Sequence, residues 1–212
     1  LSAGTGYWGS ASRNYYKTVA GTSGTTTPTT TTTTGTGTTV TVPAGSGLTV
    51  TLASDQPAAG LFGESFASRP FTKLLFTASS DGDVSVKSLT IKRTGQGSDA
   101  TFSGVIGLDE GSLRMGSSKT FGSDHTLKLT EKFTVKAGTT KAVILAGDSD
   151  SDQNDYNGQL VSLSLAAVDA GSTTVNASFD LTGNQMTINS TLAIGNLTLT
   201  RGALDPGSSQ TK

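Results

Sequence analysis

An alternation of apolar and polar residues with a period of two runs through most of the chain and constrains its fold more than any other feature. Clear examples are LTVTLA (48–53), FTKLLFTA (71–78) and QLVSLSLAAV (159–168). Successive side chains of a strand point to opposite faces of a sheet, so this pattern predicts half-buried strands. No window shows the i, i+3, i+4, i+7 apolar spacing of an amphipathic helix. An all-β protein is therefore expected.

Gly-rich and Ser-rich clusters such as SSDGD, TGQGSD and KAGTT separate these segments and are typical of turns. About ten to twelve short strands at regular spacing favour an antiparallel Ig-like β-sandwich, with a barrel as the alternative. The strands are expected at 39–42, 48–53, 71–78, 83–93, 101–108, 126–130, 132–137, 140–147, 159–168, 173–179, 186–190 and 192–200.

The segment DVSVKSLTIKR (83–93) carries a break in the alternation. Its apolar residues follow one phase through Val86 and the opposite phase from Leu89 onward. We expect a β-bulge near Lys87 and Ser88, because one extra residue restores the facing of the strand. Such a bend is common where a strand passes from one sheet to the other.

Composition divides the chain into an aromatic N-terminal arm (1–22), an extended Thr/Gly/Pro linker (23–38), a β-sandwich domain (39–201) and a C-terminal segment (202–212). The last segment is interpreted as a tail or as the start of a further repeat, since LTVTLASDQPAAG (48–60) aligns with LTLTRGALDPGSS (197–209). Chance similarity between two Thr-rich strands is the alternative.

Charge and residue usage argue against several function classes. The chain has 15 Lys and Arg against 16 Asp and Glu, which gives a net charge of -1. A nucleic-acid partner would need a basic excess, and membrane insertion as a helix would need about 18 apolar residues in a row. The chain has neither, and it has no cysteine for disulfides or thiolate metal sites.

Nothing in the sequence assembles the parts of a catalytic site, so the protein is not expected to be an enzyme. GTGYWG (4–9) matches G-x-G-x-x-G but lacks the flanking strand and helix of a nucleotide site. His125 is the single histidine, and its neighbours Ser123 and Asp124 are too close along the chain to form a triad with it. A pair of carboxylates for glycoside hydrolysis remains an alternative.

The loop GDSDSDQNDYNG (147–158) is the strongest candidate for a metal site. It concentrates hard oxygen donors of the kind that Ca²⁺ prefers. Gln153 and Gln159 replace the glycine and the closing glutamate of an EF-hand, so a calcium loop of another type is predicted. A solvated acidic loop is the alternative. The candidate ligands are Asp148, Asp150, Asp152 and Asp155.

Three N-x-S/T triplets are candidate N-glycosylation sites. Such triplets also arise by chance in a Thr-rich chain. Their asparagines are Asn176, Asn189 and Asn196.

The N-terminal arm concentrates residues that commonly anchor interfaces. It holds four of the five Tyr and Trp residues of the chain, and these side chains bury large areas at little entropic cost. We expect residues 1–42 to dock on a neighbouring copy, partly by strand addition, with folding back onto the same copy as the alternative. The predicted interface residues are Tyr7, Trp8, Tyr15, Tyr16, Val40 and Val42.

A spaced pattern between 40 and 201 resembles the repeated Ig-like β-sandwich modules of bacterial surface-layer and other secreted cell-surface structural proteins. It comprises SDQPA, FTA, SDGDV, RTG, SDATF and VKAGTTK. The resemblance implies an extracellular location at the cell surface and a structural role in a lattice, stalk or filament, where Ca²⁺ is often involved.

Together these features predict a non-enzymatic extracellular structural subunit. It would assemble with copies of itself into a filament or surface layer, by exchange of an arm or strand between β-sandwiches. The alternative is an adhesive or carbohydrate-binding module on a Thr-rich stalk, with a cell-surface glycan as its partner.

Overall fold

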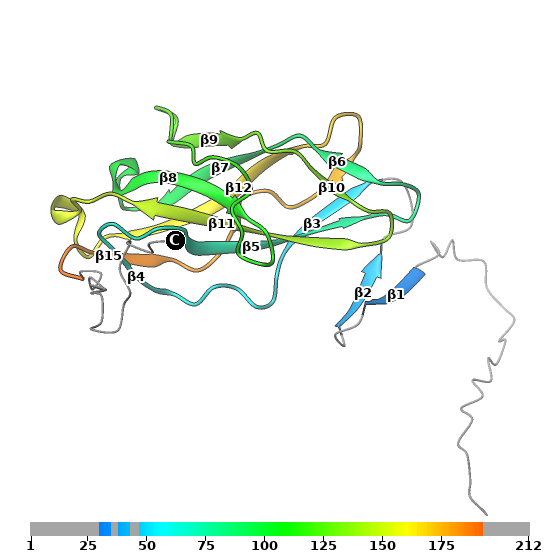
Figure 1. Cartoon of the computed structure of the whole chain (residues 1–212), viewed down its shortest axis with the longest axis horizontal. Coiled ribbons are helices and arrows are strands. Elements are labelled where there is room, and N and C mark those ends of the chain that lie inside the picture. The colour runs from blue at the N-terminus through cyan, green and yellow to red at the C-terminus, as the bar shows by residue number, and fades with distance from the viewer. Residues whose placement is uncertain (1–29, 35–37, 43–46, 193–212) are drawn as a thin grey trace, which may run out of the picture.

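The computed structural model describes residues 30–34, 38–42 and 47–192, and these residues form an all-β structure (Figure 1). Apart from two short 3₁₀ turns, at Asp99–Thr101 and Asn154–Tyr156, the regular elements in these ranges are strands. No helix among the described residues is long and apolar enough to cross a membrane. The prediction of an all-β protein is confirmed.

Two large sheets make up most of the structure. One has five strands in the order β13-β3-β5-β11-β8, and the other has the order β4-β15-β12-β7-β9 with β14 also paired to β12. The first sheet comprises β3 (Leu48–Leu52), β5 (Arg69–Ala78), β8 (Phe102–Leu108), β11 (Thr140–Ser149) and β13 (Val175–Asn176). The second comprises β4 (Gly60–Gly63), β7 (Ser88–Gly95), β9 (Thr126–Leu129), β12 (Leu160–Asp169), β14 (Leu181–Thr182) and β15 (Met186–Asn189).

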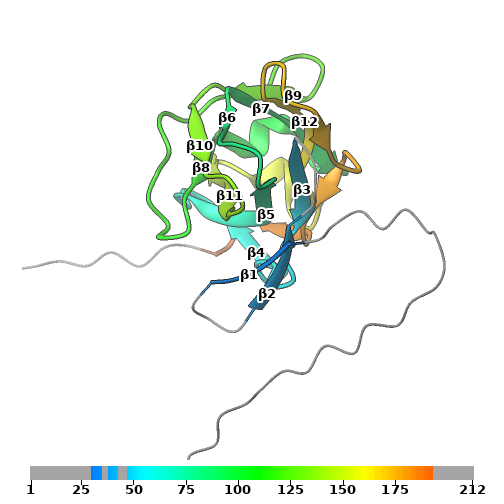
Figure 2. The ribbon, with the colours of Figure 1, turned by 90° about the vertical axis from the view of Figure 1, so that its right-hand side faces the viewer.

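The inner faces of both sheets contribute to one hydrophobic core. The end-on view of Figure 2 shows the strands arranged around the middle of the body. Leu74 and Phe76 from β5 are fully buried, as are Leu163 and Leu165 from β12. On β12 these residues alternate with Ser162 and Ser164, and on β5 they flank the partly buried Leu75. Burial of their apolar side chains between the two sheets favours the strand conformation of these segments.

Both sheets are mixed, which differs from the predicted antiparallel arrangement. Most neighbours are antiparallel, but β13 runs parallel to β3 and β15 runs parallel to β4. In each case a late segment of the chain joins a strand from the first part of the domain. Parallel strands are not joined by a hairpin, so no turn motif in the sequence predicts that they pair.

The predicted strands between 47 and 192 are all present, although 173–179 shortens to Val175–Asn176. Two further strands, β4 and β14, were not predicted. The sequence Gly60-Leu61-Phe62-Gly63 is too short to show an alternation, and its glycines suggest a turn.

The break in phase near Lys87 marks a change of partner strand rather than the expected bulge inside one ladder. β6 (Val84–Val86) pairs with β10 (Phe133–Val135) in a separate two-stranded sheet. After the single residue Lys87, β7 begins at Ser88 in the large sheet. Val84, Val86, Leu89 and Ile91 are all buried, so the phase change keeps apolar residues inside on both sides of the switch.

An aromatic cluster fills one part of the core. Phe62, Phe71 and Phe102 have ring centroids 5.1–5.5 Å apart, and Phe121 extends the cluster at 5.6 Å from Phe102. Gly147 on β11 lies so close to this cluster that a Cβ at this position would stand 2.7 Å from the ring of Phe102. The absence of a side chain at Gly147 makes room for the rings.

The N-terminal strands form a two-stranded antiparallel sheet of their own. β1 (Thr30–Thr34) pairs with β2 (Thr38–Val42), with Thr30 opposite Val42 and Thr34 opposite Thr38. The segment 23–38, predicted to be an extended linker, therefore contains a paired strand.

Candidate functional site

The end of β11 and the acidic loop that follows it hold the predicted metal ligands, and three of these carboxylates already have partners within the protein. Asp148 accepts a hydrogen bond from the backbone N–H of Ser68 at 2.6 Å and forms an ion pair with Arg114. Asp150 accepts from the backbone N–H of Asp152 at 3.0 Å, and Asp152 accepts from Asn154. These bonds shape the turns of the loop.

The predicted carboxylates do not converge. Among residues 30–34, 38–42 and 47–192, no group of three or more His, Asp or Glu side chains is arranged to hold a metal ion. Asp148 points toward Arg114, which supplies the positive charge at that position. Calcium binding by Asp148, Asp150, Asp152 and Asp155 stays a prediction.

The side chain that anchors this loop is Gln153, which the sequence indicated only as a departure from the EF-hand pattern. Gln153 is fully buried, and its Nε2 donates to the carbonyl oxygen of Thr101 at 3.0 Å. Its backbone N–H donates to Glu64 at 3.1 Å. A glutamine in a run of exposed polar residues carries no periodic signal, so the sequence could not identify it as buried.

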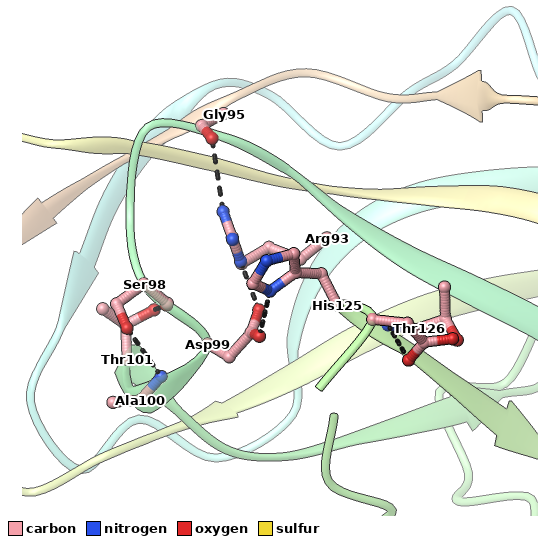
Figure 3. Close-up of polar contacts among 9 residues, drawn as sticks. Arg93, Gly95, Ser98, Asp99, Ala100, Thr101, His125 and Thr126 are labelled. Atoms are coloured by element: carbon pink, nitrogen blue, oxygen red, sulfur yellow. Dashed lines mark hydrogen bonds and ion pairs between the residues drawn. The ribbon is translucent and has the colours of Figure 1, made fainter. Parts of the chain in front are cut away.

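The single histidine belongs to a charged cluster that joins two loops. Asp99, in the turn before β8, accepts a hydrogen bond from Nε of Arg93 on β7 and lies 2.5 Å from Nδ1 of His125, as Figure 3 shows. His125 has a positive φ of 59°, and its carbonyl oxygen accepts from the N–H of Arg93 at 3.1 Å. Partial burial alone would raise the pKa of Asp99, but the bonds with His125 and Arg93 outweigh it and hold that pKa below its ordinary value.

This cluster has the form of a structural clamp. The hydroxyl of Ser98 caps the N–H of Ala100, and the hydroxyl of Thr126 donates to Asp124. The hydroxyls of Ser98, Thr101 and Thr126 are thus engaged locally, and among the described residues the side chain of His125 is hydrogen-bonded to Asp99. Through its contacts with Arg93 and His125, Asp99 holds the turn at 98–101 against the loop that precedes β9.

The predicted glycosylation and interface residues fall partly outside the described residues. Asn176 is exposed on β13, and Asn189 ends β15, where its Oδ1 accepts from Thr191. Val40 and Val42 lie on β2, opposite Thr32 and Thr30. Asn196 and the four aromatic residues of the arm, Tyr7, Trp8, Tyr15 and Tyr16, lie outside the described ranges.

The edges of the two sheets differ in how they are protected. The outer edge of β8 is covered by the segment 113–119, in which Lys119 exchanges backbone hydrogen bonds with Val105 at 2.8 and 2.9 Å. The outer edge of β4 has no strand partner within the described residues, and it carries the exposed side chain of Leu61. An open edge with an apolar side chain can accept a further strand.

No protein-family model matches the chain, and no curated protein matches it significantly.

Proposed function

We propose that this protein is a non-enzymatic structural subunit of the bacterial cell surface. Copies of it assemble into an extracellular filament or surface layer by exchange of the N-terminal arm between neighbours. Each copy contributes residues 47–192 as an Ig-like β-sandwich body, and the arm joins one body to the next.

The β1–β2 hairpin is the observation that carries this proposal. Among the described strands it forms a separate sheet in which each strand has only one partner. An isolated two-stranded hairpin is marginally stable in water, and it gains stability when it joins a larger sheet. Its sequence combines β-branched residues with no charge, which suits it to pair with a further strand.

The body of the subunit offers what such a contact needs. One core joins its two sheets, and the outer edge of β4, which carries the exposed Leu61, has no strand partner within the described residues. Backbone hydrogen bonds along an added strand supply affinity, and the Tyr and Trp residues at 7–16 supply additional buried area. The contact joins two different surfaces, so it propagates as an open filament as long as successive copies do not close into a ring.

The experiment is electron microscopy of the purified full-length chain beside a variant that lacks residues 1–42. We expect polymers from the full-length chain and single globules from the shortened variant. The control is a variant that keeps residues 1–42 but has serine in place of Thr25–Thr27, so that the arm is mutated without being removed. Single globules from the full-length chain over a wide range of concentrations would exclude the proposed assembly.

A further inference from the structure

We infer that the open edge of β4 in one copy is the acceptor for β2 of a second copy. This inference rests on the proposed function and names the two strands that meet. The added strand would extend the sheet β4-β15-β12-β7-β9, and β1 would follow as its new outermost strand.

The other edges of the described body are poor acceptors. β13 offers two residues, and β6 and β10 offer three each. The edge of β8 is occupied by residues 113–119. The edge strand β9 carries the exposed Lys128, and a charged residue on an edge opposes pairing with another strand. By contrast, β4 has four uncharged residues, and its outer side has no strand partner within residues 47–192.

An apolar row crosses the outer face of the sheet at β4. Leu61 lies opposite Thr187 on β15, and Thr187 lies opposite Leu160 on β12, so the three side chains share one face. Leu61 is 43% exposed and Leu160 is 36% exposed, whereas the next residue along β4, Phe62, is fully buried. An added strand with apolar residues at alternate positions would continue this row.

β2 has the required pattern. Its sequence TTVTV is uncharged and carries valine at two alternate positions, 40 and 42. One edge of β2 pairs with β1, and its other edge has no partner among the described strands. Placement of β2 on β4 would therefore pair the outer edge of β4 with the edge of β2 that does not face β1.

If β2 occupies the edge of β4, the dimensions of the body require that it come from a second copy. Gly63 at the end of β4 accepts a 2.6 Å hydrogen bond from Ser149, the last residue of β11. The first residue of β11, Thr140, lies opposite Thr77, and Thr77 lies opposite Thr49 near the start of β3. Ten residues of strand span about 30 Å, so the start of β3 and the end of β4 lie at opposite ends of the body (Figure 1).

The connection between β2 and β3 is too short for that span. The five peptide steps from Val42 to Gly47 reach at most about 18 Å. Gly47 lies before the start of β3, on the side away from β4. The β2 strand of the same copy therefore cannot lie along β4, and a neighbouring copy can supply it.

A charged substitution on the acceptor edge tests the inference. Leu61→Lys places a charge on β4 at an exposed position, so the body should still fold with an unchanged circular dichroism spectrum. Leu113→Lys, at a leucine that is 68% exposed on the segment covering β8, is the matched control. We expect Leu61→Lys to abolish polymers seen by electron microscopy and Leu113→Lys to leave them intact.

Cross-linking identifies the occupant of the edge. The chain has no cysteine, so a Leu61→Cys variant can be mixed with variants that carry Val40→Cys, Thr41→Cys or Val42→Cys. Paired strands bring Cβ atoms to about 5 Å, which a disulfide can bridge. We expect mild oxidation of the mixture to give a dimer that joins the two different variants.

The outcomes separate this inference from the proposed function. Polymers that persist in Leu61→Lys, with no cross-link between the variants, would overturn the choice of β4 and leave assembly itself standing. The carbonyl oxygen of Leu192 lies beside Gly63, so a cysteine within 193–200 is tested in the same way. A cross-link from Leu61→Cys to that cysteine within one chain would assign the edge to the C-terminal segment and overturn the inference. Absence of polymers from the unmodified chain would exclude both proposals.

Discussion

The hydroxyl of Thr72 donates a 2.5 Å hydrogen bond to the backbone carbonyl oxygen of Leu163, and so joins the two large sheets through the core. Thr72 lies on β5 and Leu163 on β12, and both are fully buried. The same hydroxyl accepts a 3.0 Å hydrogen bond from the N–H of Gly183. One buried oxygen atom thus connects both sheets and the segment between β14 and β15.

Replacement of Thr72 by valine should destabilise the protein although the shape of the side chain is kept. The buried carbonyl oxygen of Leu163 would lose this donor and the partly buried N–H of Gly183 its acceptor, and a buried polar group without a partner costs about 1–3 kcal/mol. Urea unfolding of Thr72→Val measures this loss. Thr51→Val, at an exposed position of β3, is the control and should change the free energy of unfolding by less than about 0.5 kcal/mol. Equal effects of the two substitutions would show that the cross-sheet hydrogen bond contributes nothing specific.

Addition of a methyl group at Gly147 should disturb the aromatic cluster. The new Cβ would lie 2.7 Å from the ring of Phe102 and 3.1 Å from that of Phe71, so both rings must move. Overpacking of this kind costs about 1–3 kcal/mol. The melting temperature of Gly147→Ala should fall, while Gly82→Ala, where a Cβ meets nothing within 4 Å, should leave it nearly unchanged. A Gly147→Ala protein as stable as the original would mean that the cluster adapts without strain.

Much of the fold follows from the alternation of residues along single strands. The strands between 47 and 192 with five or more residues were all predicted, because burial of one face imposes a period of two. The change of partner at Lys87 also left a mark in the sequence, since Val86 and Leu89 could both be buried only if the phase shifted.

The remaining features depend on contacts between distant segments. β4 was missed because its position is set by parallel pairing with β15, more than a hundred residues later. Gln153 is buried by Thr101 and Glu64, which are remote in sequence. The acidic loop suggested a metal site, but Arg114 and the N–H of Ser68 engage Asp148, and no local pattern could reveal either partner.

The Asp99 cluster should make stability depend on acid. The pKa of Asp99 is lowered in the folded protein, so its stabilising contribution is fully present above the unfolded-state value of about 3.9 and is lost as pH falls through the lower folded value. In Asp99→Asn this contribution is absent. The difference in free energy of unfolding between the two proteins should therefore stay constant above about pH 5 and shrink below about pH 4.

Urea unfolding between pH 2 and pH 7 checks this dependence, within about the range where carboxylates titrate. Asp55, Asp83 and Asp124 also have lowered pKa values, through hydrogen bonds with Lys73, Lys136 and Thr126. These three carboxyl groups are present in both proteins, so their contributions cancel in the difference in free energy of unfolding. A difference that stays the same down to the lowest pH would show that the Asp99 charge does not stabilise the fold.

Removal of residues 1–46 should leave the body folded. The β1–β2 hairpin pairs with no strand of the two large sheets, whereas Gly47 is retained and still bonds to Ser79. We expect a single cooperative unfolding transition and a free energy of unfolding within about 0.5 kcal/mol of that of the full chain, measured on monomers. A broad transition would show that the N-terminal segment contributes to the core.

In the proposed contact the hairpin is the donor and the outer edge of β4, which has no strand partner among the described residues, is the acceptor, so the subunit would have a direction. In a polymer held by the proposed contact, one terminus would display a vacant β4 and the other an unused hairpin. Growth at the two termini would then proceed at unequal rates, as it does along other polar fibres built from head-to-tail contacts. A fragment that supplied the hairpin without a body would occupy the vacant terminus and act as a chain terminator, which would set filament length by its ratio to the intact protein.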